Sequence, residues 1–176
     1  TDEPALSSAW LHTYVEASRL AFADRAQYVA DPDFVAAPGG DWHTLLNPAY
    51  LRARAQLIGP TSMKKVEPGT PVRSRASTWA PMADQPEYGT SHISIVDSAG
   101  NALAMTTTIE DAFGARQMVK GFLLNNQLTD FSFAPRDAQG RAMANRVQPG
   151  KRPRSSMSPT LVFDKATGCL LYTSDA

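Results

Sequence analysis

The stretch Pro86-Glu-Tyr-Gly89-Thr90-Ser-His92-Ile-Ser-Ile-Val-Asp97 marks the place where the character of the chain changes. Before it the sequence is irregular and rich in proline, and after it apolar and polar residues alternate as in a β-strand. If the Gly89–Thr90 bond is cut, Thr90 becomes an N-terminus whose hydroxyl is a nucleophile and whose free amine can act as its base. Taken alone, however, this dipeptide favours the start of an ordinary hairpin.

The composition is that of one ordinary globular domain, because 43% of the 176 residues are hydrophobic. The 17 basic and 17 acidic residues balance, and no run of like charge predicts binding to nucleic acid or to an anionic membrane. We therefore expect a small molecule as the partner. No apolar run approaches the roughly 18 residues of a membrane span. The single cysteine and the three scattered histidines lack zinc-site spacing, so we expect no structural metal.

Both ends of the sequence are unusual. The chain begins at Thr1 without methionine and close to a predicted helix, so we expect a fragment of a longer protein. Residues 169–176, CLLYTSDA, resemble the translation of a transposase adapter used in sequencing libraries, and we interpret them as an artefact outside the fold. The alternative is that residues 170–172 continue a natural strand.

The first part of the chain predicts two helices. From about Ser7 to Val29 apolar residues recur with helical spacing, and Asp31-Pro32 ends the pattern. Asn47-Pro48 predicts the N-cap and first turn of a second helix, which continues through Ile58. We expect the first helix to bury an apolar stripe and to expose its charged residues; the stripe is Trp10, Tyr14, Ala17 and Ala21, and the charged residues are Glu16, Arg19 and Asp24.

Residues 59–89 show no period, and five prolines prevent a sustained helix or a central strand there. A long irregular segment inside a compact domain is often functional or a linker. It suits a processing linker that moves once its C-terminal end has been cut, although a plain interdomain linker would have the same composition.

After Gly89 the pattern changes to the alternation of a β-strand. A strand, a turn at residues 97–101 and a returning strand predict a hairpin, whose second strand brings Thr106 or Thr108 back towards Thr90. Residues 121–125 and 161–163 predict further strands. Helices first and antiparallel hairpins afterwards indicate an α+β fold.

Four sequence blocks follow one another in a specific order: GTSHISIVDSAGNALA, TTTIEDAFG, GFLLNNQLTDFS and KRPRSSMSPT. With the upstream run EASRLAFADRAQYVADPDFV they resemble the γ-glutamyltranspeptidases, which are N-terminal-nucleophile hydrolases, over about Ala9 to Phe163. The resemblance implies a four-layer αββα sandwich that is incomplete here. It implies that residues 1–89 end a large subunit, with the processing linker at about 59–89, and that residues 90–168 begin the small catalytic subunit.

The resemblance also implies roles for individual residues. Thr90 is expected to attack the carbonyl of Gly89, splitting the precursor, and later the γ-glutamyl amide, while Thr108 holds the nucleophile in place. The α-ammonium of the substrate is expected to bind acceptors and its α-carboxylate to bind hydroxyl donors; the acceptors are Glu110, Gln127 and Asp130, and the donors are Ser155 and Ser156. Many members of the family have asparagine where Glu110 stands. Without the family, the two serines would be turn or capping residues.

The activity implied is γ-glutamyl transfer and hydrolysis. Glutathione and other γ-glutamyl compounds would be the donors, water, amino acids or peptides the acceptors, and no cofactor is needed. The family implies a periplasmic or extracellular location. The arginine that pairs with the substrate carboxylate and the two glycines of the oxyanion hole lie outside the fragment, which alone should be essentially inactive.

Two alternatives stay open at this point. A cephalosporin acylase of the same fold would take a glutaryl-type substrate that lacks the α-ammonium, and Asp130 and Gln127 argue against it because their acceptor atoms would then face no cation. An uncleaved, non-catalytic homologue would act as a binding or structural protein.

Overall fold

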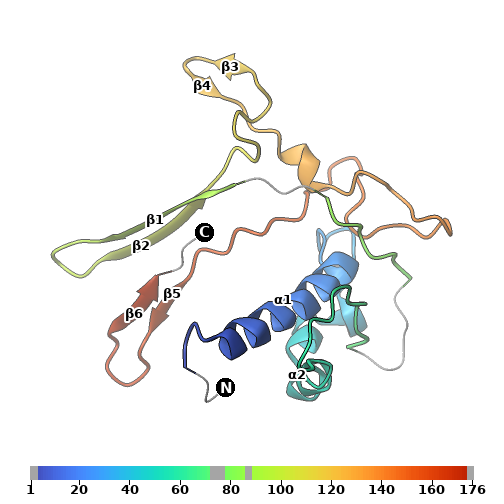
Figure 1. The fold of residues 1–176 in the computed structure, drawn as a ribbon. Helices are drawn as coiled ribbons and strands as arrows, with labels where there is room; N and C mark the ends of the chain where they lie inside the picture. The colour runs from blue at the N-terminus through green and yellow to red at the C-terminus, as the bar shows by residue number, and fades with distance from the viewer. Residues whose placement is uncertain (1–3, 72–77, 86–88, 174–176) are drawn as a thin grey trace. The chain divides into compact units, whose positions relative to one another are not determined.

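A computed structural model describes residues 4–71, 78–85 and 89–173 and divides into two compact units. The first unit contains residues 1–84 and 131–154, and the second contains residues 85–130 and 155–176. Both α-helices of the described chain belong to the first unit, and the three β-hairpins belong to the second (Figure 1). The expected mixture of helix and strand is confirmed. The described strands pair only as two-stranded ladders, so the four-layer arrangement stays a prediction.

Helix α1 runs over Ser8–Tyr28, as the sequence pattern predicts, and Ser7 caps it by accepting a hydrogen bond from the Trp10 N–H. The prediction of its buried face was wrong. Glu16 is only 1% exposed, whereas Tyr14, on the predicted apolar stripe, is 60% exposed. Apolar spacing failed because part of the surface that covers α1, around Glu16, is a polar backbone rather than another apolar element.

That backbone belongs to residues 59–69, the first part of the predicted linker. Glu16 accepts hydrogen bonds from the Ser62 hydroxyl at 3.0 Å and from the Met63 N–H at 2.9 Å. The bond from Met63 is the main reason why the pKa of Glu16 lies below its usual value. His12 Nε2 donates to the Gly59 carbonyl at 2.8 Å. This part of the linker is therefore docked along α1, while residues 72–77 and 86–88 lie outside the described chain.

Two short 3₁₀ turns, η1 at Pro38–Gly40 and η2 at Trp42–Leu46, precede helix α2 at Pro48–Ala55. The predicted cap is confirmed, because Asn47 Oδ1 accepts from the N–H groups of Ala49 at 2.9 Å and Tyr50 at 3.3 Å. The helix is shorter than the predicted range, which extended to Ile58. Of the described helices, none is both long and apolar enough to cross a membrane.

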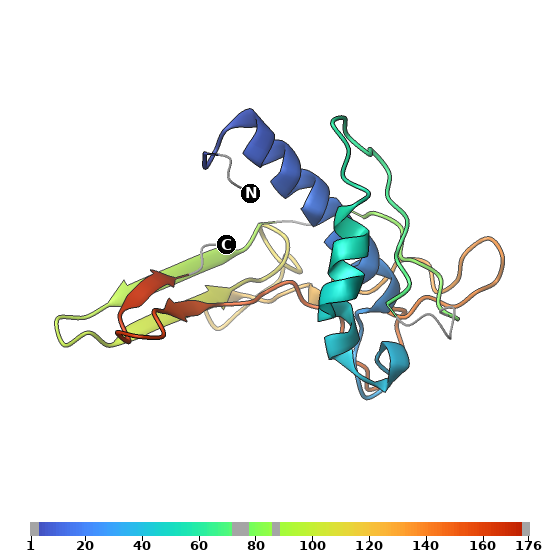
Figure 2. The ribbon, with the colours of Figure 1, turned by 90° about the horizontal axis from the view of Figure 1, so that it is seen from below.

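A network of polar groups joins α1, α2 and the docked linker. Figure 2 shows the two helices and the chain that follows α2. Asp24 lies at its centre and accepts from the Tyr50 hydroxyl at 2.6 Å, from Arg54 Nη2 at 3.2 Å and from the Gly69 N–H at 2.7 Å. The Tyr28 hydroxyl donates to the Gly69 carbonyl at 2.7 Å. A hydrogen-bonded network of this kind helps to specify one arrangement of its elements.

Gly69→Ala is expected to destabilise the first unit, because a Cβ there would overlap the Tyr50 hydroxyl and would come within 2.9 Å of Arg54 Cδ. Moving Tyr50 aside would also break its bond to Asp24. We expect a loss of about 1–3 kcal/mol in the free energy of unfolding, measured by urea denaturation. The matched control is Gly59→Ala, where the added Cβ meets nothing within 4 Å. Equal stability of the two variants would contradict the packing described here.

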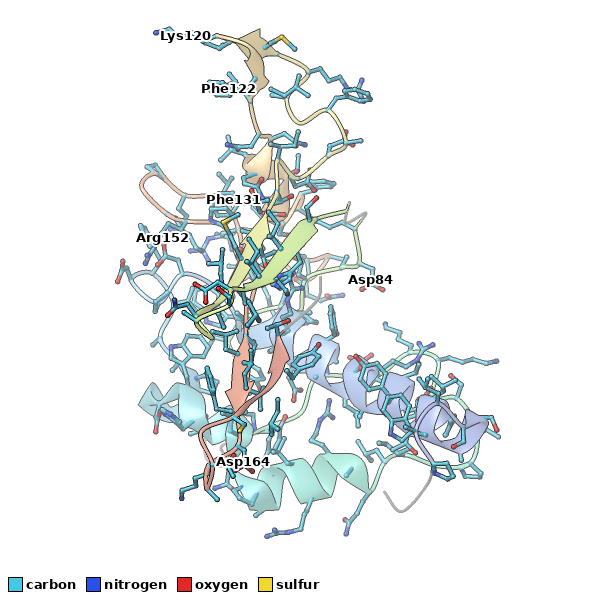
Figure 3. All side chains as sticks on the ribbon, turned by 90° about the vertical axis from the view of Figure 1, so that its left-hand side faces the viewer. Asp84, Lys120, Phe122, Phe131, Arg152 and Asp164 are labelled. Carbon is cyan, nitrogen blue, oxygen red and sulfur yellow. The ribbon has the colours of Figure 1, made fainter. Side chains whose placement is uncertain are left out.

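Strand β1 at Ser91–Val96 and strand β2 at Ala102–Thr107 form the predicted hairpin of the second unit. Strands β3 at Met118–Val119 and β4 at Phe122–Leu123 form a second hairpin. Its two turn residues, Lys120 and Gly121, both have positive φ, as a type I′ turn requires. Figure 3 labels Lys120 and Phe122 at the tip of this hairpin.

Strand β5 at Leu161–Phe163 pairs with β6 at Leu170–Thr173, and the turn that joins them contains Asp164 (Figure 3). β5 lies beside β2. Four of the eight residues interpreted as an artefact thus belong to a strand. Because short apolar runs of either origin pair readily with a neighbouring strand, the artefact stays a prediction, and its last three residues lie outside the described range.

Candidate active site

The β1–β2 register shows where the candidate nucleophile and the two threonines lie on the hairpin. Ser91 pairs with Thr107 at the end of the β1–β2 ladder, so Thr90 comes directly before this last pair and Thr108 directly after it. Residues opposite one another in such a pair have Cα atoms only about 4.5–5.5 Å apart. Of the two threonines that the sequence left open, Thr106 pairs with His92, and Thr108 lies at the end of the ladder where Thr90 enters it. Both Gly89 and Thr90 are exposed, so the bond between them is accessible.

His92 is the second residue of β1 and follows Thr90 by two positions. His92 Nδ1 and Thr106 Oγ1 are 2.8 Å apart across the ladder. Thr108 follows Thr106 by two positions and is the first residue after β2.

Thr108 is oriented by the chain that follows it. Its Oγ1 accepts a hydrogen bond from the Glu110 N–H at 2.8 Å. A hydroxyl has one hydrogen to donate in addition to its acceptor lone pairs. With an acceptor position engaged by the backbone, the hydroxyl hydrogen is free to be directed at a neighbouring oxygen, as the expected role of Thr108 requires.

Asn126 joins the chain around Glu110 to the next segment of the site. Its N–H donates to the Ile109 carbonyl at 3.2 Å, and its Oδ1 accepts from the Asp111 N–H at 3.0 Å. These two bonds place Glu110 beside the start of η3 at Gln127–Asp130. Sequence reasoning did not single out Asn126. The signal available was its place inside the block GFLLNNQLTDFS, directly before Gln127.

Gln127 and Asp130 contact one another within η3. Gln127 Nε2 donates to Asp130 Oδ2 at 2.9 Å, which leaves the amide oxygen Oε1 of Gln127 facing elsewhere. This oxygen and Glu110 Oε2 are both buried, and neither has a hydrogen-bond partner among the residues that the structure describes. Buried acceptors without a donor are costly and therefore rare in folded proteins. Two of them on adjoining segments indicate a site for a donor, and the acidic members favour a cation.

The backbone at Glu110 is also unusual, with φ at 74°. Left-handed backbone is uncommon for residues other than glycine, and asparagine tolerates it better than glutamate does. Strained positions of this kind cluster at functional sites.

Ser155 and Ser156 are exposed. The Ser155 hydroxyl accepts from the Met157 N–H at 3.1 Å, which is the local turn that the interpretation without the family expects. The two serines follow Arg154, the last residue of the first unit, and therefore belong to the second unit. The residues expected to bind the substrate thus come from two segments of that unit, 85–130 and 155–176. The role of the serines in binding a carboxylate stays a prediction. Within the described ranges no group of three or more His, Cys, Asp or Glu side chains could hold a metal ion.

Gly114→Ala tests how tightly the loop before Asn126 is held. Gly114 has φ at 50°, and an added Cβ would overlap the Leu124 carbonyl oxygen, which is backbone and also accepts from the Ala115 N–H. Gly121→Ala is the matched control, since it shares the positive φ but meets nothing within 4 Å. We expect the first variant to lose about 1–3 kcal/mol more than the second in thermal denaturation. A smaller loss for Gly114→Ala would contradict the close approach.

Comparison with known proteins supplies a family. The model of the family described as Gamma-glutamyltranspeptidase matches residues 2–173. The glutathione hydrolase proenzyme of Pseudomonas aeruginosa is 39% identical over 165 residues, which are 89% of this chain and 26% of that protein. The proenzyme of Bacillus subtilis is 42% identical over 156 residues, 84% of this chain and 25% of that protein. The chain thus spans about a quarter of the length of these relatives.

Among solved structures, the γ-glutamyltranspeptidase of Pseudomonas nitroreducens complexed with L-DON is 45% identical and matches 43% of this chain and 42% of that chain. Its TM-score of 0.36 is below the level that indicates a shared fold. An acivicin-inhibited γ-glutamyltranspeptidase is 38% identical, with a TM-score of 0.37 and coverage of 46% of this chain and 45% of that chain.

Proposed function

The chain belongs to the γ-glutamyltranspeptidase family, and on that premise we propose that the full protein uses Thr90 to transfer and hydrolyse γ-glutamyl groups. Its donors are glutathione and other γ-glutamyl amides, and its acceptors are water, amino acids and peptides. The relatives named glutathione hydrolase proenzyme support both the hydrolysis and the maturation from a precursor.

Maturation begins at the exposed Gly89–Thr90 bond. The Thr90 hydroxyl oxygen attacks the Gly89 carbonyl, the amide C–N bond breaks, and the acyl group moves from nitrogen to oxygen. Water then hydrolyses the ester, which leaves a carboxylate on Gly89 and a free α-amine on Thr90. The exposure of Gly89 and Thr90 supports this step, and no described residue lies within 4 Å of the position where a Cβ of Gly89 would stand.

Turnover uses the same hydroxyl. The freed amine of Thr90 accepts its proton as the hydroxyl oxygen attacks the γ-carbonyl of the substrate. The amide C–N bond breaks, the leaving amine takes a proton, and a γ-glutamyl ester of Thr90 remains. From glutathione the leaving amine is cysteinylglycine. Thr108 holds the attacking oxygen, and water or an acceptor amine then resolves the ester. No metal or organic cofactor takes part in this sequence.

The observation that carries the substrate class is the pair of buried, unpartnered oxygens on Glu110 and Gln127. An α-ammonium has three N–H donors and a positive charge, so it would pair both oxygens and balance the Glu110 carboxylate. Asp130 fixes the Gln127 amide and adds a second negative charge to the subsite. Ser155 and Ser156 supply hydroxyl donors for the α-carboxylate. A glutaryl group has no ammonium and would leave these acceptors unpaired.

We further propose the four-layer αββα sandwich for the complete protein. Residues 1–89 would end the large subunit, with the processing linker at about 59–89, and residues 90–168 would begin the small subunit, with 169–176 derived from an adapter. A periplasmic or extracellular location follows from the family.

The substrate class can be tested on the full-length protein with γ-glutamyl-p-nitroanilide and glutaryl-p-nitroanilide, which differ only in the α-ammonium group. We expect kcat/KM to be at least about 100-fold higher for the γ-glutamyl compound, because rejecting a substrate that leaves buried acceptors unpaired is a large effect. A preference for the glutaryl compound would instead identify an acylase. An uncut chain that turns over neither compound would identify the non-catalytic homologue.

A further inference from the structure

The core of the first unit is assembled from both sides of the Gly89–Thr90 bond. One buried cluster packs Ala30 and Val35 against Ala144, and a second packs Ala80 and Met82 against Met143. In each cluster the last-named residue comes from the segment 131–154, which follows the proposed cut. Neither product of scission therefore contains a complete core for this unit.

Backbone contacts join the same two parts of the chain. The Ala80 N–H donates to the Ala142 carbonyl at 2.9 Å, within a parallel bridge between Ala80 and Met143. Because these contacts use the backbone, they fix the position of the segment whatever its side chains. The segment 131–154 is thus held by residues that the proposed scission assigns to the other product.

One contact between the two parts is an ion pair, whereas the contacts described above are apolar or between backbone groups. The Asp31 side chain is 1% exposed, and three hydrogen bonds from Arg152 reach it. Its Oδ2 accepts from the Arg152 N–H at 2.8 Å and from Nε at 3.1 Å, and its Oδ1 accepts from Nη2 at 2.9 Å. Asp33 completes the pairing, since its N–H donates to Asp31 Oδ1 at 3.1 Å. The guanidinium group of Arg152, whose side chain is 67% exposed, thus forms a bidentate pair with a buried carboxylate.

The hydrogen bonds from Arg152 hold the pKa of the Asp31 carboxyl well below its usual range. A lowered pKa in the folded state means that the pair stabilises the unit above the ordinary pKa of an aspartate, and that this contribution is lost only as the pH falls through the lowered value. The carboxylate is therefore ionised, and the ion pair intact, at neutral pH.

Arg154 reinforces the attachment two residues later. It is 7% exposed, and its Nη1 donates to the Arg25 carbonyl at 3.2 Å near the end of α1. Its N–H donates to Asn145 Oδ1 at 3.0 Å, within the segment itself. Figure 3 labels Arg152 on this stretch, which leads directly into Ser155.

We infer that Asp31 and Arg152 form a latch between the two products of scission, with Asp31 in the large subunit holding the segment 131–154 of the small subunit. The inference rests on the proposed cut at Gly89–Thr90. Because each product lacks part of the shared core, the first unit has to fold before the bond is cut. Afterwards the latch opposes the separation of two chains that peptide bonds no longer join.

The test uses full-length protein with an affinity tag on the large subunit, in wild type, Asp31→Asn, Arg152→Gln and the double variant. Small subunit retained on the resin at increasing urea concentrations gives the apparent dissociation constant. Hydrogen bonds to charged groups contribute enough that we expect each single variant to raise this constant about tenfold or more. The double variant should be no weaker than the weaker single variant, because both remove one interaction.

Asp33→Asn is the matched control. Its carboxylate also accepts from Arg152 Nη2, at 3.0 Å, but it is 75% exposed, and exposed pairs contribute little. We expect retention within about twofold of wild type. Wild-type retention in both Asp31→Asn and Arg152→Gln would overturn the latch. If Asp31→Asn does not fold, Arg152→Gln carries the test, since the Arg152 side chain is mostly exposed.

The experiment distinguishes a failure of the proposed cut from a failure of the latch. A denaturing gel of each sample shows whether the chain is cut, whereas retention on the resin shows whether the pieces stay together. A second set of the same variants carries a site-specific protease sequence between Gly89 and Thr90. If wild type stays uncut on its own, the proposed function fails, and the protease-nicked set still decides whether Asp31 and Arg152 hold the pieces.

Discussion

Replacing Thr90 with alanine in the full-length protein is expected to leave a single uncut chain without γ-glutamyl transfer or hydrolysis. The variant lacks the oxygen that attacks the Gly89 carbonyl, so the α-amine that serves as base in turnover is never released. Both the scission of the precursor and the turnover of substrate thus fail because this one oxygen is missing. The readouts are the number of bands on a denaturing gel and the release of p-nitroaniline from γ-glutamyl-p-nitroanilide.

Two further variants give this experiment its controls. Thr90→Ser keeps a hydroxyl and should still be cut, more slowly than wild type. Thr107→Ala removes a neighbouring exposed threonine that pairs with Ser91 on the same hairpin, and it should be cut and active. Cutting of Thr90→Ala at the wild-type rate would contradict the account, as would an uncut Thr107→Ala variant that is folded.

The second large effect is expected at Glu110, whose buried Oε2 is proposed to receive the substrate ammonium. Glu110→Gln keeps the size of the side chain but removes its charge and places an amide in the pocket. Because charge-assisted hydrogen bonds contribute about 1.5–3 kcal/mol, we expect kcat/KM for γ-glutamyl-p-nitroanilide to fall about 10- to 100-fold. The fall should appear mainly in KM, since the ammonium is bound equally in the ground state and the transition state.

Glutaryl-p-nitroanilide separates this role from a general loss of structure. A compound without an ammonium gains nothing from the Glu110 charge, so its kcat/KM should change little or rise. Glu67→Gln removes an exposed carboxylate from the other unit and should change neither substrate. A parallel fall for both substrates in Glu110→Gln would indicate that the carboxylate supports the structure rather than the ammonium.

Elements with strong local signals could be predicted from the sequence. Asn47 caps α2 as expected, because its carboxamide oxygen reaches two N–H groups of the next turn. The turn at residues 97–101 closes the β1–β2 hairpin, and Gly100 there has the positive φ that the turn needs. These features depend on a few neighbouring residues, so local chemistry determines them.

The buried face of α1 could not be predicted in this way. A helical stripe indicates burial when the covering surface is apolar, but the face of α1 that carries Glu16 and Asp24 is covered by the backbone of residues 59–69. Glu16 and Asp24 are drawn inward because they can accept from N–H groups of that segment. Nothing in the spacing of the helix residues indicates which long-range partner will cover them.

In the candidate site, too, some features could be predicted from neighbouring residues and others depend on long-range contacts. The returning strand was predicted to end near Thr90, and β2 ends at Thr107, which pairs with the residue after Thr90. The role of Thr108 stays a prediction. The positive φ of Glu110 and the bracing by Asn126 were not predicted, because both depend on how residues 109–111 meet a segment 15 residues further along the chain. The block GFLLNNQLTDFS pointed to that segment without indicating what each of its polar side chains would contact.

The most direct test of the central claim is the intact mass and N-terminal sequence of the chains in purified full-length protein that has not been exposed to a protease. We predict two chains, of which the smaller begins Thr-Ser-His-Ile at Thr90 and the larger ends at Gly89. A single chain would contradict the account, and so would a new N-terminus at any other residue.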